Sequence, residues 1–259
     1  SGTYKGGFVI NAEGEKEAIK GRSSFIMKKK VKVYPDTLCW LKDLTYAYNE
    51  PFVREYFSHI GYDNYPVVGV NWHQAQAFCN WRTQYFNSNA GVRVQAWRLP
   101  NEVEWEYAAR GGLSGAKYPW GGPYTRNKKG CFLANFKPLR GNYISDGGFT
   151  TVPVGTYEPN GFGLYDMAGN VAEWTGDAFD ESAYQVTHDL SPYYQITAKK
   201  SDNKILKRKV IRGGSWKDIA YFMQCGVRTY EYADSARSFI GFRTVRTRIE
   251  YSHCKNKML

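Results

Sequence analysis

Two segments of the chain place hydrophobic residues at helical spacing, and both start with a polar capping pattern. In the first, Asn71 is followed three residues later by Gln74, and Trp72, Ala75 and Cys79 then recur on one face. Asn followed at the third position by Gln or Glu is typical of a capping box, in which each side chain binds the other residue's backbone amide. The pattern predicts a helix after Asn71, with Cys79 buried in its apolar face.

The second segment has the same pattern. Asn101 stands three residues before Glu104, and Gly111 and Gly112 follow directly after Arg110. Glycine just beyond the last helical residue ends a helix because it adopts left-handed backbone angles without strain. We therefore expect a helix that begins after Asn101 and ends at Arg110. Its apolar positions are Val103, Trp105, Ala108 and Ala109.

Short apolar runs elsewhere predict strands over residues 92–99, 209–212 and 239–245. The polar and charged stretch 199–208 predicts an exposed loop or hairpin tip. The chain contains 26 glycines and 10 prolines, and turn signals at this density favour short elements joined by long ordered loops.

The same patterns divide the chain into three parts. Residues 1–33 are rich in Lys, Gly and Glu and lack sustained periodicity, which predicts a peripheral segment. The main domain is expected over 34–249, followed by a tail over 250–259. No stretch of eighteen or more apolar residues occurs, so the sequence predicts no membrane-spanning helix.

Charge and cysteine usage narrow the classes of function. The net charge is +11, and basic residues cluster at 28–30 and 199–209. Neither cluster lies in a recognisable nucleic-acid module, so an acidic protein or a membrane surface is the expected anionic partner rather than nucleic acid. The five cysteines contain no C-x-x-C pair, which argues against a zinc site; whether two of them form a disulfide stays open.

The segment from Asn160 to Trp174 carries the most specific chemistry. It places glycines, Asp166, Asn170 and Glu173 closely between aromatic residues. A stiff, glycine-bent loop of this composition can direct carbonyl and carboxylate oxygens inward, as Ca²⁺ requires. The alternative is that the carboxylates only brace the loop through hydrogen bonds.

Four ordered blocks of the sequence resemble the formylglycine-generating enzyme (sulfatase-modifying factor) family. The blocks are Pro66–Trp72, Trp97–Gly111, Gly169–Trp174, and Arg212–Trp216 together with Gly241–Arg243. The resemblance implies an α+β fold of the C-type-lectin-like, sulfatase-modifying-factor kind, with few regular elements and long ordered loops. The family's usual opening block is absent from this chain.

The resemblance also implies that oxidase chemistry is lost. Active members of the family carry two cysteines at the third and eighth positions after the Ser of the Arg-Gly-Gly-Ser block, and these thiolates bind copper(I), a soft ion. Counted from Ser215, the equivalent residues are Asp218 and Met223. Cys225 lies nearby but alone. We therefore expect no copper, no catalytic residues and no enzymatic activity.

The resemblance also implies two calcium sites, and this chain keeps more of the residues of these sites than of the copper site. One site would use the side chains of Asp166 and Glu173 with the carbonyls of Gly169 and Val171. A second would use the side chains of Asn135 and Asp146 with the carbonyls of Phe136 and Gly148. Each set supplies about four of the six to eight oxygens that Ca²⁺ takes, before bidentate binding and water. The expected cofactor is a structural calcium ion.

Further segments resemble one catalytically silent branch of the family. Residues 34–40, 46–51, 62–66 and 135–148 look like the gliding-motility lipoproteins of the type IX secretion system, the GldK/PorK type. This resemblance implies a periplasmic location at the outer membrane of a diderm bacterium, with a lipid anchor that is not visible in this chain. It also implies self-association into a ring with a periplasmic partner of the GldN/PorN type.

Three hypotheses follow for the function. The first is a non-enzymatic structural subunit of the periplasmic ring complex that serves type IX protein secretion and gliding motility. The second is a copper- or thiol-dependent oxidase of the formylglycine-generating type, which would depend on Cys225. The third is a module that binds glycans or peptides, which the lectin-like fold permits but does not specify.

Overall fold

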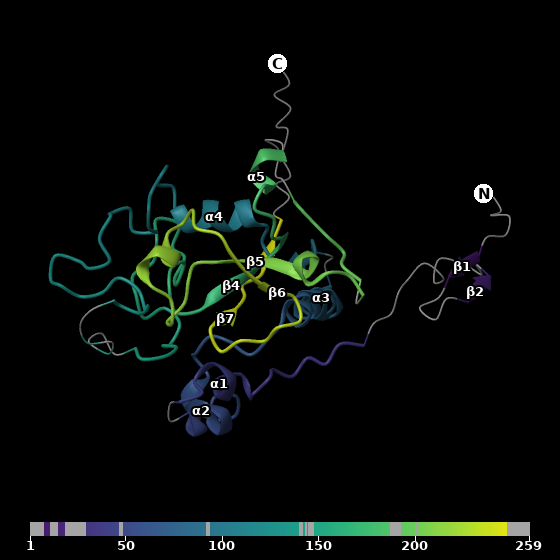
Figure 1. Ribbon diagram of the computed structural model, residues 1–259, viewed down its shortest axis with the longest axis horizontal. Coiled ribbons are helices and arrows are strands. Elements are labelled where there is room, and N and C mark those ends of the chain that lie inside the picture. The colour runs from purple at the N-terminus through teal and green to yellow at the C-terminus, as the bar shows by residue number, and fades with distance from the viewer. Residues whose placement is uncertain are drawn as a thin grey trace, which may run out of the picture. The chain divides into compact units, whose positions relative to one another are not determined.

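A computed structural model gives the fold of the chain (Figure 1). It describes residues 8–10, 15–18, 30–46, 49–91, 94–139, 142, 144, 148–186, 193–199 and 201–247. Contacts divide the chain into one unit over Ser1–Lys32 and a second over Val33–Leu259. Within the first unit, β1 (Phe8–Ile10) pairs antiparallel with β2 (Lys16–Ala18). No helix in the described part of the chain is long and apolar enough to cross a membrane.

Both predicted helices are present with their capping boxes. Helix α3 spans Trp72–Asn89, and the side chain of Asn71 accepts a hydrogen bond from the amide of Gln74 at 2.9 Å while Gln74 returns one to Asn71. Helix α4 spans Glu102–Arg110 and is capped in the same way by Asn101 and Glu104. It ends at Gly111, whose φ of 56° lies in the left-handed region.

A four-stranded sheet forms the centre of the second unit, with the strand order β6-β5-β4-β7. Its strands are β4 (Ala172–Ala178), β5 (Arg208–Arg212), β6 (Thr229–Tyr232) and β7 (Ile240–Gly241). All residues of β4 are buried, and β4 is an interior strand: β5 pairs with it antiparallel on one side and β7 pairs with it parallel on the other. The loop expected from Asn160 to Trp174 therefore gives way to a strand at Ala172.

The strand predicted over residues 92–99 is shorter in the structure. Strand β3 contains only Trp97 and Arg98, which pair with β8 (Val245–Arg246); residues 92 and 93 lie outside the described residues. Side chains of α3 bind amides that a partner strand would otherwise bind. Asn87 accepts from the amide of Val94 at 2.9 Å, and Thr83 accepts from that of Trp97 at 2.8 Å.

The predicted run 239–245 is also divided, into β7 and β8. Between them, Arg243 turns inward to Glu173. Two short helices that the sequence analysis did not identify, α1 (Cys39–Asp43) and α2 (Glu50–Glu55), pack against each other through Trp40 and Phe52, whose rings stack at 4.8 Å. Trp40 is fully buried and also stacks on Trp216.

Long loops occupy the chain between α4 and β4, drawn in teal in Figure 1. The described residues in this stretch contain no helix or strand, apart from a single bridge between Arg126 and Phe132. A second small core lies among these loops and includes Tyr118, Phe136 and Met223. Few regular elements and long ordered loops are the α+β architecture predicted from the sequence, and this prediction is confirmed.

Candidate functional site

Asp218 and Met223, at the positions where the resemblance implies copper ligands in active members, both make contacts within the fold; Asp218 is half-buried and Met223 is buried. The hydroxyl of Ser215 donates to Asp218 Oδ2 at 2.6 Å, and the carbonyl of Asp218 accepts from the amide of Lys137 at 2.9 Å. Met223 has no exposed surface and packs against the loop residues around Tyr118. A carboxylate and a thioether in these roles do not reproduce a pair of thiolates.

Cys225 is buried as well. Its side chain is 1 % exposed and packs with Trp105, Ala109 and Met167. Burial raises the pKa of its thiol to about 11, so at neutral pH the thiolate, which is the reactive form, is scarce. Cys39, Cys79, Cys131 and Cys225 are free thiols, and among these four only Cys131 is exposed.

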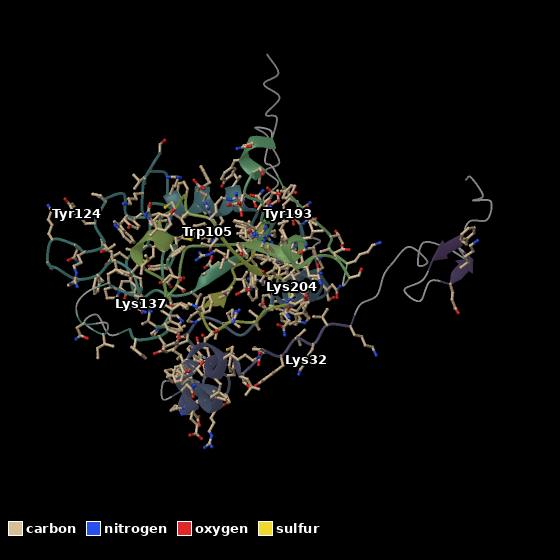
Figure 2. The ribbon with its side chains drawn as sticks, in the orientation of Figure 1. Lys32, Trp105, Tyr124, Lys137, Tyr193 and Lys204 are labelled. Carbon is tan, nitrogen blue, oxygen red and sulfur yellow. The ribbon has the colours of Figure 1, made fainter. Side chains whose placement is uncertain are left out.

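Glu173, from the predicted first calcium site, lies at the centre of a polar cluster on β4. Arg243 donates from Nε to Oε2 at 2.5 Å and from Nη2 to Oε1 at 2.6 Å, a bidentate ion pair. The indole nitrogen of Trp105, on α4, donates to Oε2 at 2.7 Å, and Figure 2 shows Trp105 between α4 and the sheet. Both carboxylate oxygens are therefore already bonded to cationic or polar donors.

Asp166 has a different environment. Its backbone φ of 53° lies in the left-handed region, and its Oδ2 accepts from the amide of Gly155 at 2.8 Å. Its Oδ1 is buried and has no hydrogen-bond partner among the described residues. Burial raises the pKa of this carboxyl, and the negative charge of Glu173 adds to the shift. Asp166, Glu173 and Arg243 line a pocket of about 450 Å³.

The other predicted ligands lie close to this cluster. The carbonyl of Asn135 accepts from the amide of Asn170 at 2.8 Å, next to Gly169 and Val171. A Cβ on Gly169 would lie 2.3 Å from that carbonyl oxygen, so the two loops meet too closely for any side chain.

In the second predicted set, Asn135 Nδ2 donates to the carbonyl of Thr150 at 2.6 Å. A Cβ on Gly148 would lie 2.7 Å from Asn135 Oδ1, so these two predicted ligands adjoin. Phe136 is buried directly after Asn135. Asp146 lies outside the described residues.

The residues fit a calcium ion in part. The buried, unpartnered Oδ1 of Asp166 is an oxygen that a hard cation would satisfy. Glu173, in contrast, is neutralised by Arg243, and a cation would have to displace that guanidinium. The described residues contain no group of three or more His, Cys, Asp or Glu side chains able to hold a metal. The structural calcium ion remains a prediction.

Calcium titration tests this prediction directly. If Ca²⁺ binds the folded chain, ten times its Kd stabilises the protein by about 1.4 kcal/mol, and a chelator reverses the gain. We expect the Tm to rise with CaCl₂ and to fall again with EDTA, and Mg²⁺ to have a smaller effect because it demands stricter geometry. The Asp166→Asn variant serves as the control. If CaCl₂ does not change the Tm of the unmodified protein, the loop binds no calcium and is stabilised by its hydrogen bonds alone.

A buried layer of charges links α4 to the sheet, and nothing in the sequence patterns indicated it. Arg212 on β5 has a fully buried side chain and forms ion pairs with Glu102 and Glu106. Arg228 binds both oxygens of Glu102, at 2.5 and 2.8 Å. Because all four charges are paired, this layer fixes the position of α4 on the sheet.

A second buried pair lies on the same sheet. Lys209 on β5 is 5 % exposed, and its ammonium lies 4.2 Å from the centre of the Trp72 ring. Burial lowers the pKa of Lys209 from 10.5 to about 8, with a partial offset from Asp177. Burial raises the pKa of Asp177 to about 6, although the amides of Glu102 and Tyr194 donate to it.

Comparison with known proteins places the chain in a family. The sulfatase-modifying factor enzyme 1-like domain matches residues 23–248. A formylglycine-generating enzyme of Streptomyces coelicolor is 35 % identical over 71 % of this chain and 53 % of its own length. The inactive C-alpha-formylglycine-generating enzyme 2 of Bos taurus is 35 % identical over 69 % of this chain and 49 % of its own length. The chain thus spans about half the length of these curated relatives.

Solved structures agree with the sequence comparison. PvdO from Pseudomonas aeruginosa superposes with a TM-score of 0.56 and 27 % identity, covering 71 % of this chain and 62 % of PvdO. Variable protein 1 of Treponema denticola gives a TM-score of 0.52 and 28 % identity, covering 71 % of each chain. Relatives named as active and as inactive both occur among the matches. This chain belongs to the sulfatase-modifying factor family.

Proposed function

We propose that the chain is a catalytically silent member of its family that serves as a structural subunit of a periplasmic ring. The observation that carries the loss of activity is the state of the two copper-ligand positions. Asp218 is bonded to Ser215, and Met223 is fully buried in a small apolar core. Two of its relatives are named as inactive enzymes, so the loss of activity has precedents within the family.

The ring assignment rests on the resemblance of residues 34–66 to the gliding-motility lipoproteins of type IX secretion. In the structure this segment forms α1 and α2 and contributes Trp40, Phe52 and Tyr56 to the largest core, so it is an integral part of the fold. Tyrosines are also exposed elsewhere. Tyr124 is 76 % exposed, and within the segment itself Tyr46 is 103 % exposed. Tyr is enriched in protein interfaces because it combines a large apolar face with a polar tip, and such residues are candidates for assembly contacts.

Isolation from the native envelope in mild detergent, followed by electron microscopy and identification of co-purifying proteins, tests this function. We expect large rings that contain this chain and a second periplasmic subunit of the GldN/PorN type. Small, single particles with no companion protein would overturn the ring assignment. The loss of catalysis would then be judged separately, from copper binding and from oxidation of cysteinyl peptides.

Thiol labelling tests the silent active site independently. We expect iodoacetamide to modify Cys131 in the folded protein and to leave Cys225 unmodified until the protein unfolds, because Cys225 is 1 % exposed and burial raises its pKa to about 11. Peptide mapping by mass spectrometry distinguishes the sites. Rapid labelling of Cys225 at pH 7, or its protection by stoichiometric copper(I), would instead favour the oxidase.

A ligand-binding module is the second candidate, and the pocket beside Asp166 favours it. This pocket combines the apolar side chains of Val67 and Phe242 with the charged groups of Asp166 and Arg243. Mostly apolar pockets with a few convergent polar groups are typical of small-molecule sites. A glycan and peptidoglycan array reports on this candidate, and binding that is lost in an Arg243→Gln variant would support it.

A further inference from the structure

The segment 199–208, defined here as the basic tip, exposes an apolar pair between basic residues. Its 3-10 helix η3 (Lys204–Lys207) contains Ile205 and Leu206, which are 54 % and 40 % exposed. None of the four residues of η3 is buried. Figure 2 labels Lys204 on the segment that leads into β5.

Local hydrogen bonds hold this tip in a defined conformation. The side chain of Asn203 accepts from the amide of Ile205 at 3.1 Å. The guanidinium of Arg208 donates to the carbonyl of Ile205 at 3.3 Å. Asp202 accepts from the amide of Lys199 at 2.7 Å, which closes the preceding turn. The exposed apolar pair therefore lies on a turn that these hydrogen bonds stabilise.

The charges around the tip are strongly unbalanced. Five of the ten residues from Lys199 to Arg208 are basic, and Asp202 is the one acidic residue of this stretch. Acidic side chains on adjoining segments are paired: Glu181 with Arg208, Asp234 with His73, and Glu231 with Arg237. Lys199 and Lys204 are exposed, so the tip presents positive charge to its surroundings.

We propose that the basic tip binds the surface of a bilayer containing anionic phospholipid, with Ile205 and Leu206 inserted between head groups. Basic residues close to an anionic leaflet are attracted to it, and aliphatic side chains gain from leaving water at the acyl boundary. The proposal rests on the envelope location proposed above for its biological setting. The contact itself is defined by the side chains of the tip.

The chemistry of the tip favours a bilayer over an acidic protein. The apolar residues are two neighbouring aliphatic side chains on an exposed turn. Protein hot spots are instead enriched in Trp, Tyr and Arg that fill complementary pockets. Lysine is depleted in protein interfaces but suits a fluid array of phosphates, because its compact ammonium needs no fixed geometry. An acidic polypeptide is therefore the competing outcome of the test.

Vesicle co-sedimentation tests the proposal with the full chain. We expect binding to vesicles of phosphatidylglycerol and phosphatidylcholine, little binding to phosphatidylcholine alone, and a steep loss when salt rises from 0.1 to 0.5 M, since screening shortens the reach of surface charge. The double variant Lys199→Gln/Lys204→Gln should lose about 25-fold in affinity, or about fivefold for each charge. The matched control Lys128→Gln/Lys129→Gln removes two exposed lysines elsewhere and should lose less than about threefold.

A second variant and its control test the apolar contribution to vesicle binding. Ile205→Ser/Leu206→Ser should weaken vesicle binding by about tenfold or more, since two aliphatic side chains no longer leave water. Ile60→Ser changes a residue that is 78 % exposed at another place and should have no effect. Circular dichroism confirms that each variant is folded.

Several outcomes would overturn the proposal. They are equal binding to neutral vesicles, equal losses in the tip variants and their controls, and capture of polyglutamate with no capture of vesicles. Electron microscopy of Ile205→Ser/Leu206→Ser in the native envelope separates this proposal from the proposed function. Intact rings with lost vesicle binding in this variant would support both, whereas vesicle binding by the unmodified protein without rings would overturn the ring assignment alone.

Discussion

Replacing Arg212 with Met is expected to lower the free energy of unfolding by about 2–4 kcal/mol, because it removes the fully buried cation that Glu102 and Glu106 share and leaves them only Arg228 and Arg110 as partners. The side chain of Arg212 is fully buried, forms ion pairs with Glu102 and Glu106, and donates to the carbonyls of Cys225 and Val227 at 2.7 and 3.0 Å. For a domain of this size the change corresponds to a fall in Tm of about 10 °C. Thermal unfolding followed by circular dichroism measures it.

The control is an arginine in an exposed ion pair. Arg54 pairs with Glu50 one helical turn earlier on α2, and its side chain is 72 % exposed. Arg54→Met should change the stability by less than about 0.5 kcal/mol, because exposed pairs of this kind contribute little. If the two variants unfolded at the same temperature, the buried charge layer would not hold α4 on the sheet.

Replacing Lys209 with Met is expected to act in the opposite direction. Keeping a proton on an amine whose pKa falls from 10.5 to about 8 costs the fold about 3 kcal/mol at neutral pH. Met removes this cost while still packing on the ring of Trp72. The pKa of about 8 already includes the attraction to Asp177, and Met loses only the contact of the ammonium with the Trp72 ring, so the net gain at pH 7 is expected to be about 1–3 kcal/mol. Chemical denaturation measures this gain.

The dependence on pH identifies the cause. The folded state releases the Lys209 proton near pH 8, whereas the unfolded state keeps it until about pH 10.5, so the unmodified protein gains stability relative to the variant across that interval. The advantage of Lys209→Met should therefore be full below pH 8 and shrink as the pH approaches 10.5. Lys128→Met, at an exposed position, should show no such trend. An advantage that stayed constant with pH would point to packing alone.

Local signals in the sequence predicted the two long helices, because capping is a local matter. Asn71 with Gln74, and Asn101 with Glu104, contact only residues three positions away, and the structure reproduces both boxes. The ends of the strands were harder to predict. Side chains of α3 bind amides of the segment before Trp97 in place of a partner strand, and no pattern within residues 92–99 could have shown this.

The sequence likewise predicted only part of the candidate site. The positions of Asp218 and Met223 followed from a count along the sequence. The structure adds that Asp218 accepts a hydrogen bond from Ser215 and that Met223 is buried. The environment of Glu173 did not follow, since its partner Arg243 lies about seventy residues later. A sequence signal did exist, because a buried carboxylate needs a nearby cation. Choosing Arg243 from 35 basic residues required the fold.

The pairing of β3 with β8 has a consequence for the biosynthesis of the protein. It joins residues 97–98 to residues 245–246, and the central sheet likewise needs β7, at Ile240–Gly241, to pair with β4. Contacts this distant form late, because a long loop must close before they contribute. A ribosome therefore releases nearly the whole domain before its sheet can be completed. A nascent chain in that interval still exposes the residues of β4 and β5 that the finished sheet buries, and such exposed strands are prone to aggregate.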